Sequence, residues 1–97
     1  MKNITPRELK AWINENRSFQ LIDVREDWER EAFHIGGLHI PLGEILSRKE
    51  ELKNEEPVVL YCEKGIRSSI IIQRLESAGF TNLYNLTGGM SEWKQAE

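Results

Sequence analysis

The chain of 97 residues carries a formal net charge of -3 at pH 7 and consists of 39% apolar and 30% charged residues. This length suits one domain with one core, so a single domain is expected over residues 1–97. The charge gives no reason to expect nucleic acid or an anionic membrane as a partner. No apolar run is long enough to span a membrane, and the N-terminus lacks the apolar core of a signal peptide, which favours a cytoplasmic location.

A helix, a strand and a second helix are predicted in the first third of the chain. Thr5 followed by proline is typical of a helix start, so the first helix is expected over residues 6–15. The nearly continuous apolar run 21–24 is typical of a strand buried in a parallel sheet. Asp27 is the expected N-cap of a short helix over residues 27–33. Helical spacing places three apolar residues on the buried face of the first helix: Leu9, Trp12 and Ile13.

The rest of the chain alternates strands with helices. In chain order the predicted elements are a strand at 38–40, a helix at 43–54, a strand at 58–62, a helix at 66–78, a strand at 82–86 and a short helix after Gly89. This alternation predicts an α/β domain in three layers, with a mainly parallel sheet of four to five strands and helices on both faces. The loops that follow the strands would then meet at the carboxyl edge of the sheet, which is the expected site.

The stretch from Val58 to Ser69 carries the chemistry. Apolar strand residues lead into Cys62, the only cysteine, and a short loop with one glycine then opens a helix. Unpaired backbone N–H groups and the positive end of the helix dipole favour an anion there, and they stabilise a thiolate. The sequence therefore predicts Cys62 as a nucleophile, cradled by the backbone of an anion-binding loop: Glu63, Lys64, Gly65, Ile66, Arg67 and Ser68.

A lone cysteine excludes a disulfide within the chain and a cysteine-based zinc cluster, and it fits a reducing compartment. His34 and His39 are five positions apart, with no acidic or cysteine cluster at ligand spacing. Neither a metal site nor a cofactor is therefore expected. His34 stays open as a general acid or base near the site, while Trp28, Phe33 and Trp93 are expected to pack in the core or at its rim.

Several separate motifs, in the same order, resemble the rhodanese family from about Ile4 to Trp93. They are Leu21–Glu26 with Glu29, Ile35–Gly37 with Ile40–Leu42, the Cys62–Arg67 loop, Ala78–Phe80, and Asn85–Gly89 with Trp93. The resemblance implies a rhodanese-like fold. It also implies that Cys62 accepts a sulfane sulfur from thiosulfate or a persulfide and passes it to cyanide, a thiol or a protein acceptor. An exposed nucleophile without a covering lid is compatible with a protein acceptor.

The loop departs from the pattern of relatives that use thiosulfate, in which its second and third positions are both basic. Here they are Glu63 and Lys64, and the carboxylate of Glu63 repels an anionic donor. Arg67 either stays near the sulfur or turns outward to the donor. The family pattern gives Asp23 and Arg25 a supporting role beneath the loop. Glu29 is a candidate ion-pair partner of Arg25.

Two alternatives remain from the sequence. Cysteine phosphatases resemble this site but have Cys-x5-Arg, whereas Cys62 and Arg67 form Cys-x4-Arg. A loop one residue shorter suits a single sulfur atom and is too tight for a phosphate. The other alternative is a non-catalytic binding or sulfur-delivery module. The presence of Cys62 favours catalysis, because many domains of this fold without enzymatic activity lack the cysteine.

Overall fold

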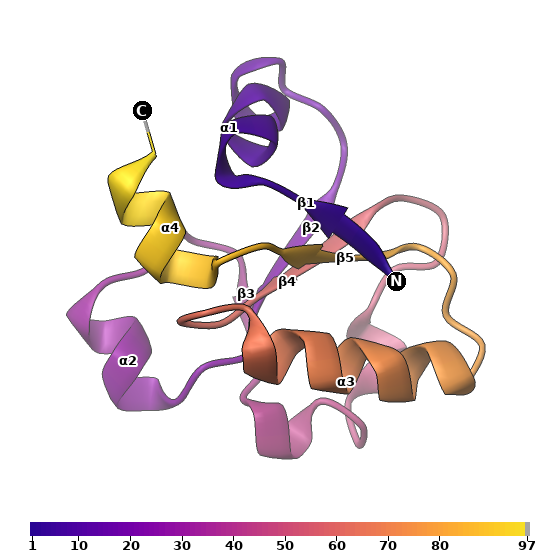
Figure 1. Cartoon of the computed structure of the whole chain (residues 1–97). Helices are drawn as coiled ribbons and strands as arrows, with labels where there is room; N and C mark the ends of the chain where they lie inside the picture. The colour runs from indigo at the N-terminus through magenta and orange to yellow at the C-terminus, as the bar shows by residue number, and fades with distance from the viewer. Residues whose placement is uncertain (97) are drawn as a thin grey trace.

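A computed structural model describes residues 1–96 of the chain (Figure 1). Its centre is one sheet of five strands in the order β1-β5-β4-β2-β3. The strands are β1 (Lys2–Ile4), β2 (Gln20–Asp23), β3 (Leu38–His39), β4 (Val58–Tyr61) and β5 (Leu83–Leu86). Every neighbouring pair is parallel. The α/β fold and its parallel sheet are confirmed, although the sequence did not predict the edge strand β1.

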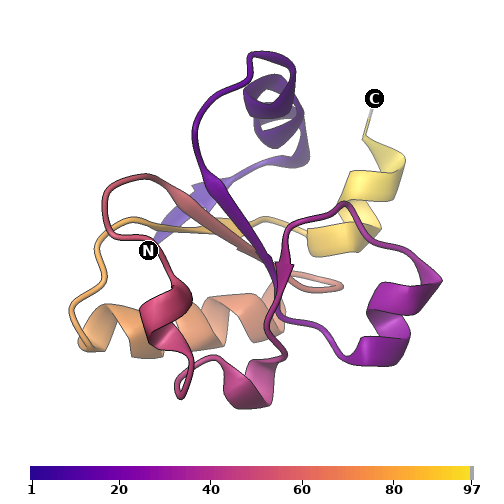
Figure 2. The same cartoon turned by 180° about the vertical axis from the view of Figure 1, so that it is seen from behind.

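Helices cover both faces of this sheet, as predicted. The α-helices are α1 (Pro6–Asn14), α2 (Asp27–Ala32), α3 (Ile66–Ser77) and α4 (Gly89–Gln95). In Figure 1, α1 and α4 lie on one face and α3 lies on the other. The view from behind shows the segment of residues 42–51 on the same side as α3 (Figure 2). Within residues 1–96, no helix combines the length and the apolar character that crossing a membrane requires.

The strand β4 organises the core because it lies at the centre of the sheet and is buried along its whole length. Side chains alternate along a strand, so Val58 and Leu60 face α3 while Val59 and Tyr61 face α1 and α4. Full burial of one such side chain contributes about 1.5–3 kcal/mol. Cys62 continues the alternation and joins the cluster on the side of α3. The core thereby sets the direction in which the sulfur points.

The predicted helix over residues 43–54 is wrong. Two short 3-10 helices, η1 (Leu42–Glu44) and η2 (Lys49–Glu51), take its place. Ile45 and Leu52 are both buried against the sheet on the side of α3. The packing of these two side chains overrides the helical pattern of the surface residues between them.

Two smaller expectations about the helices are also corrected. The N-cap of α2 is Glu26 rather than Asp27, and the Glu26 N–H donates to the Glu29 carboxylate at 3.0 Å. Ile13 is 43% exposed, although helical spacing predicted it on the buried face. Ile13 is the penultimate residue of α1, where a small rotation of the helix end decides between core and solvent. Trp28 is 70% exposed and lines a surface hollow with Phe33, so of the expected core or rim positions it takes the rim.

Candidate functional site

Three loops meet at the carboxyl edge of the sheet, where the sequence placed the site. Backbone hydrogen bonds join them: the Val24 N–H donates to the Tyr61 carbonyl at 3.1 Å, and the Met90 N–H donates to the Cys62 carbonyl at 3.0 Å. The residues after β2, β4 and β5 therefore form one continuous surface. Its middle is Cys62, because β4 lies between β2 and β5.

The sulfur of Cys62 accepts two backbone hydrogen bonds from its own loop. The N–H of Gly65 lies 3.1 Å from Sγ, and the N–H of Ser68 lies 3.4 Å from it. The hydroxyl oxygen of Ser68 is also 3.3 Å from Sγ. Cys62 is only 1% exposed, so the expectation of an exposed nucleophile is wrong. Donors that converge on a buried sulfur stabilise negative charge there more strongly than water-exposed donors do.

Asn85 completes this arrangement, and the sequence analysis did not identify it. Its side-chain oxygen accepts a hydrogen bond from the Ser68 hydroxyl, and its amide donates to the Gly65 carbonyl at 3.1 Å. Asn85 is only 5% exposed. A polar residue among the apolar residues of β5 was a signal of a specific partner, because buried polar groups are rarely left unpaired.

The turn after β5 holds the loop from the other side. The Ser91 N–H donates to the Glu63 carbonyl at 2.9 Å, beside the bond from Met90 to Cys62. Gly89 has a φ of +56°, and a Cβ added there would lie 2.7 Å from the Glu63 carbonyl oxygen and closer still to that of Cys62. Only glycine allows this approach. The sequence predicted a short helix after Gly89, and the structure confirms it as α4.

Asp23 and Arg25 lie beneath the loop and contact it through Glu63. The Arg25 guanidinium donates to both carboxylate oxygens of Asp23, at 3.0 and 3.1 Å. Its remaining nitrogen lies 3.5 Å from the Glu63 carboxylate. Burial of Asp23 acts to raise its pKa, but hydrogen bonds from Arg25 and the charge of Arg25 outweigh burial and lower the pKa. Asp23 is therefore a buried carboxylate held in its charged form.

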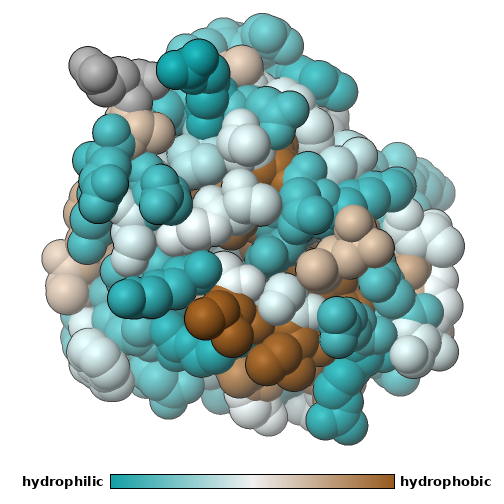
Figure 3. Space-filling view, in the orientation of Figure 1, coloured by the Kyte–Doolittle hydropathy of each residue, from teal (hydrophilic) through white to brown (hydrophobic). Residues whose placement is uncertain are grey.

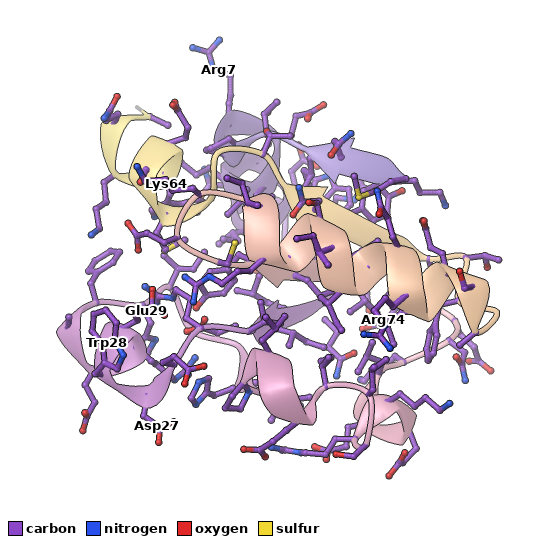
Figure 4. All side chains as sticks on the ribbon, turned by 60° about the horizontal axis from the view of Figure 1, so that its bottom comes forward. Arg7, Asp27, Trp28, Glu29, Lys64 and Arg74 are labelled. Carbon is purple, nitrogen blue, oxygen red and sulfur yellow. The ribbon has the colours of Figure 1, made fainter. Side chains whose placement is uncertain are left out.

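The predicted ion pair between Glu29 and Arg25 is wrong, because Glu29 binds Arg67 instead. The two Arg67 nitrogens lie 2.9 and 2.8 Å from the two Glu29 carboxylate oxygens. These hydrogen bonds lower the pKa of Glu29. In Figure 4, Glu29 extends from α2 toward the loop that opens α3, whereas Lys64 lies on the side of α4. Arg25 is already occupied by Asp23 and by the Phe33 carbonyl, at 2.6 Å.

An open hollow of about 290 Å³ lies above the sulfur. Its lining consists of Cys62, Glu63, Lys64, Ile66 and Arg67. His34 and His39 line a different hollow, together with Asp27, Arg30 and Glu31. The structure therefore gives no support for His34 as a general acid or base near Cys62. In the part of the chain from residue 1 to 96, no group of three or more His, Cys, Asp or Glu side chains is placed to hold a metal ion.

Comparison with known proteins agrees with this geometry. Residues 5–96 match the model of the rhodanese-like domain family. The chain belongs to the rhodanese-like family. Over 94 residues it is 44% identical to protein YqhL of Bacillus subtilis, covering 96% of this chain and 72% of YqhL. Over 88 residues it is 35% identical to the thiosulfate sulfurtransferase GlpE of Coxiella burnetii, covering 89% of this chain and 82% of GlpE.

A rhodanese-like domain protein from Staphylococcus aureus has the same fold in its crystal structure. The two superpose with a TM-score of 0.88 and 33% identity, over 96% of this chain and 91% of the other. Some members of the rhodanese family are sulfurtransferases, as the name of GlpE states. In this rhodanese-like domain, the loop after β4 surrounds one sulfur atom with hydrogen-bond donors and leaves an open hollow above it. That arrangement is suited to chemistry at the sulfur.

Proposed function

We propose that this chain is a rhodanese-type sulfurtransferase in which Cys62 carries the sulfur as a persulfide. The observation that carries the proposal is the pair of backbone donors on Sγ, namely the N–H groups of Gly65 and Ser68. The Cys62 thiolate attacks the outer sulfur of a donor. A sulfur–sulfur bond to Cys62 forms, the bond within the donor breaks, and its electron pair leaves with the rest of the donor.

The second step returns the enzyme to its starting state. A nucleophile such as cyanide, a thiol or a thiol on a protein attacks the outer sulfur of the persulfide, and the electron pair of the sulfur–sulfur bond returns to the Cys62 thiolate. The loop from Glu63 to Ser68 would hold the outer, partly anionic sulfur with its backbone N–H groups. This chemistry requires no metal or organic cofactor. A thiol nucleophile also suits a reducing compartment, so a cytoplasmic location is part of the proposal.

Three side chains would support the reaction without touching the donor. Asp23 and Arg25 hold Glu63 in place, and Asn85 holds Ser68. Burial and mutual hydrogen bonds keep these groups in one geometry, which preorganises the loop before the donor arrives. Glu29 has a different task, because it fixes the position of Arg67 at the end of the loop.

The position of Arg67 supports sulfur transfer over phosphatase chemistry. A cysteine phosphatase of similar architecture needs the guanidinium of its loop arginine to hold the phosphate. Here both terminal nitrogens of Arg67 are bound to Glu29, whose side chain is only 10% exposed. The guanidinium would have to break two charge-assisted hydrogen bonds before it could bind a phosphate.

Mass spectrometry of the intact protein tests the proposal directly. The protein is incubated with thiosulfate or an organic persulfide, and Cys62→Ser is treated in parallel. We expect a gain of one sulfur atom that cyanide removes and that the variant does not show. Hydrolysis of an aryl phosphate without any sulfur gain would refute the proposal in favour of a phosphatase. If neither reaction occurs, a non-catalytic binding module becomes the better interpretation.

A further inference from the structure

The positive charges around the hollow of Cys62 are largely neutralised by neighbouring carboxylates. Arg67 is held by Glu29, and Arg25 is held by Asp23 and Glu63. Of the cations that line the hollow, Lys64 alone has no ion pair in the described residues 1–96, and its side chain is exposed. A donor with two negative charges would therefore meet one unpaired cation beside the carboxylate of Glu63. The positive charges of Arg25, Arg67 and Lys64 are matched in number by the negative charges of Asp23, Glu29 and Glu63. The hollow therefore has no excess positive charge to attract a donor with two negative charges, and it disfavours a donor with a single negative charge less.

An apolar surface adjoins the same hollow. Ile66, at the rim, is 64% exposed, and Ile70 on the next turn of α3 is 55% exposed. Figure 3 shows the corresponding brown patch over the first turns of α3. Exposed apolar side chains that gather beside a reactive group are typical of a ligand-binding surface.

A second hollow, of about 190 Å³, lies on the other side of Glu63. Trp28, Ala32 and Phe33 of the α2 region line it, together with Arg25, Glu29, Glu63 and Lys94. Figure 4 shows Trp28 and Glu29 on the same short helix. The two hollows share Glu63, and the ion pair of Glu29 with Arg67 connects one to the other. The volume of the second hollow suits one ring-sized group, and because Glu63 borders both hollows, a ring bound beside Trp28 would lie next to the hollow over Cys62.

We propose that the sulfur donor is a small organic sulfane-sulfur compound with one negative charge and an aromatic or apolar group next to the sulfur. This inference rests on the proposed sulfurtransferase function. The aromatic hollow holds the organic group, and the ion pair between Glu29 and Arg67 disfavours donors with two negative charges. In the transfer step the Cys62 thiolate attacks the sulfane sulfur, and the organic part leaves as a thiolate or sulfinate with the electron pair of the broken bond.

Three sulfur donors distinguish the effect of donor charge from the effect of apolar contact on the rate of persulfide formation. Thiosulfate has two negative charges, while methanethiosulfonate and benzenethiosulfonate have one each. The two thiosulfonates differ only in their organic group, which is a methyl group in the first and a phenyl ring in the second. The rate of persulfide formation on Cys62 is measured by mass spectrometry and divided by the rate of each donor with free cysteine. We expect a preference for benzenethiosulfonate over methanethiosulfonate of about fivefold, the range of one aromatic contact.

Substitution of Trp28 tests the aromatic hollow. Trp28→Ala should remove the preference for the ring and bring the two thiosulfonates to similar normalised rates. The matched control is Ile13→Ala, which removes a 43% exposed apolar side chain from α1. That control should retain the preference. A preference that persists in Trp28→Ala would overturn the assignment of the hollow.

Substitution of Glu29 tests the selection by charge. Glu29→Gln leaves the Arg67 guanidinium uncompensated, so thiosulfate loading should rise about fivefold at low salt and lose the gain in high salt. The rate of loading by benzenethiosulfonate should rise less, since this donor carries half the charge of thiosulfate. The matched control is Glu51→Gln, which breaks a surface ion pair with Arg48. Thermal unfolding identifies a folding defect, in which case Glu29→Ser replaces Glu29→Gln.

The outcomes distinguish the two proposals. If all three donors load Cys62 at similar normalised rates, and Glu29→Gln changes none of them, the donor inference is wrong and sulfur transfer stands. If no donor loads Cys62, the proposed function fails and the donor inference fails with it.

Discussion

The substitution Gly89→Ala tests the geometry of the loop most directly. Gly89 has a φ of +56°, a backbone conformation that costs a residue with a Cβ about 1–2 kcal/mol. The added Cβ would also lie 2.7 Å from the Glu63 carbonyl oxygen, whereas ordinary contact begins at 3.4 Å. The loop or α4 must therefore move by up to about 1 Å, a displacement that can reduce catalysis about 100-fold. This movement strains the hydrogen bonds from Met90 and Ser91, each worth about 1 kcal/mol.

We therefore expect Gly89→Ala to lose about 3–4 kcal/mol of unfolding free energy in urea. We also expect a fall of about 100-fold in the rate of persulfide formation. The matched control is Gly79→Ala, since Gly79 has a φ of +108° and no atom lies within 4 Å of its added Cβ. It should lose only a backbone contribution, which is at least about 1–2 kcal/mol because this φ lies beyond the left-handed helical region, and it should keep its rate. Equal losses of stability and rate in the two variants would refute the account of α4 as the element that positions the loop.

Four further predictions concern buried or half-buried polar groups. Ser68→Ala should slow persulfide formation about tenfold, because it removes the hydroxyl that links the loop to Asn85. Asn85→Ala should lower the unfolding free energy by about 2 kcal/mol, because it leaves buried partners unpaired. An unchanged rate in Ser68→Ala, or an unchanged unfolding free energy in Asn85→Ala, would contradict the hydrogen-bond account. Asp23→Asn should lower the unfolding free energy by about 3 kcal/mol, since it leaves the charge of Arg25 poorly compensated in the interior. The lowered pKa values of Asp23 and Glu29 predict that stability is fully present at neutral pH and is lost progressively below about pH 5, as each carboxylate is protonated. Urea titrations between neutral and acidic pH measure this, and a flat profile would show that neither ion pair stabilises the fold.

Local sequence signals determined the main elements and the position of the site. The short apolar runs that end in charged or reactive residues predicted parallel strands, and parallel strands bring their carboxyl ends to one edge. Cys62, the glycine of its loop and the start of α3 were all visible within a few residues. The loop length followed directly from counting residues to Arg67. Such features depend on neighbours in the chain, which is why one sequence suffices to predict them.

Only the tertiary structure decided which side chains meet. Glu29 and Arg67 are 38 residues apart, and their ion pair follows from how α2 and α3 flank the sheet. Asn85 lies beneath Ser68 because β5 pairs with β4, and Cys62 is buried because α3 and its own loop pack around it. The same holds for residues 42–52, where packing of Ile45 and Leu52 replaced a helix with 3-10 turns. Contacts between distant segments depend on the packing of the whole core, so the charge and the accessibility of the site emerge only when the chain is folded.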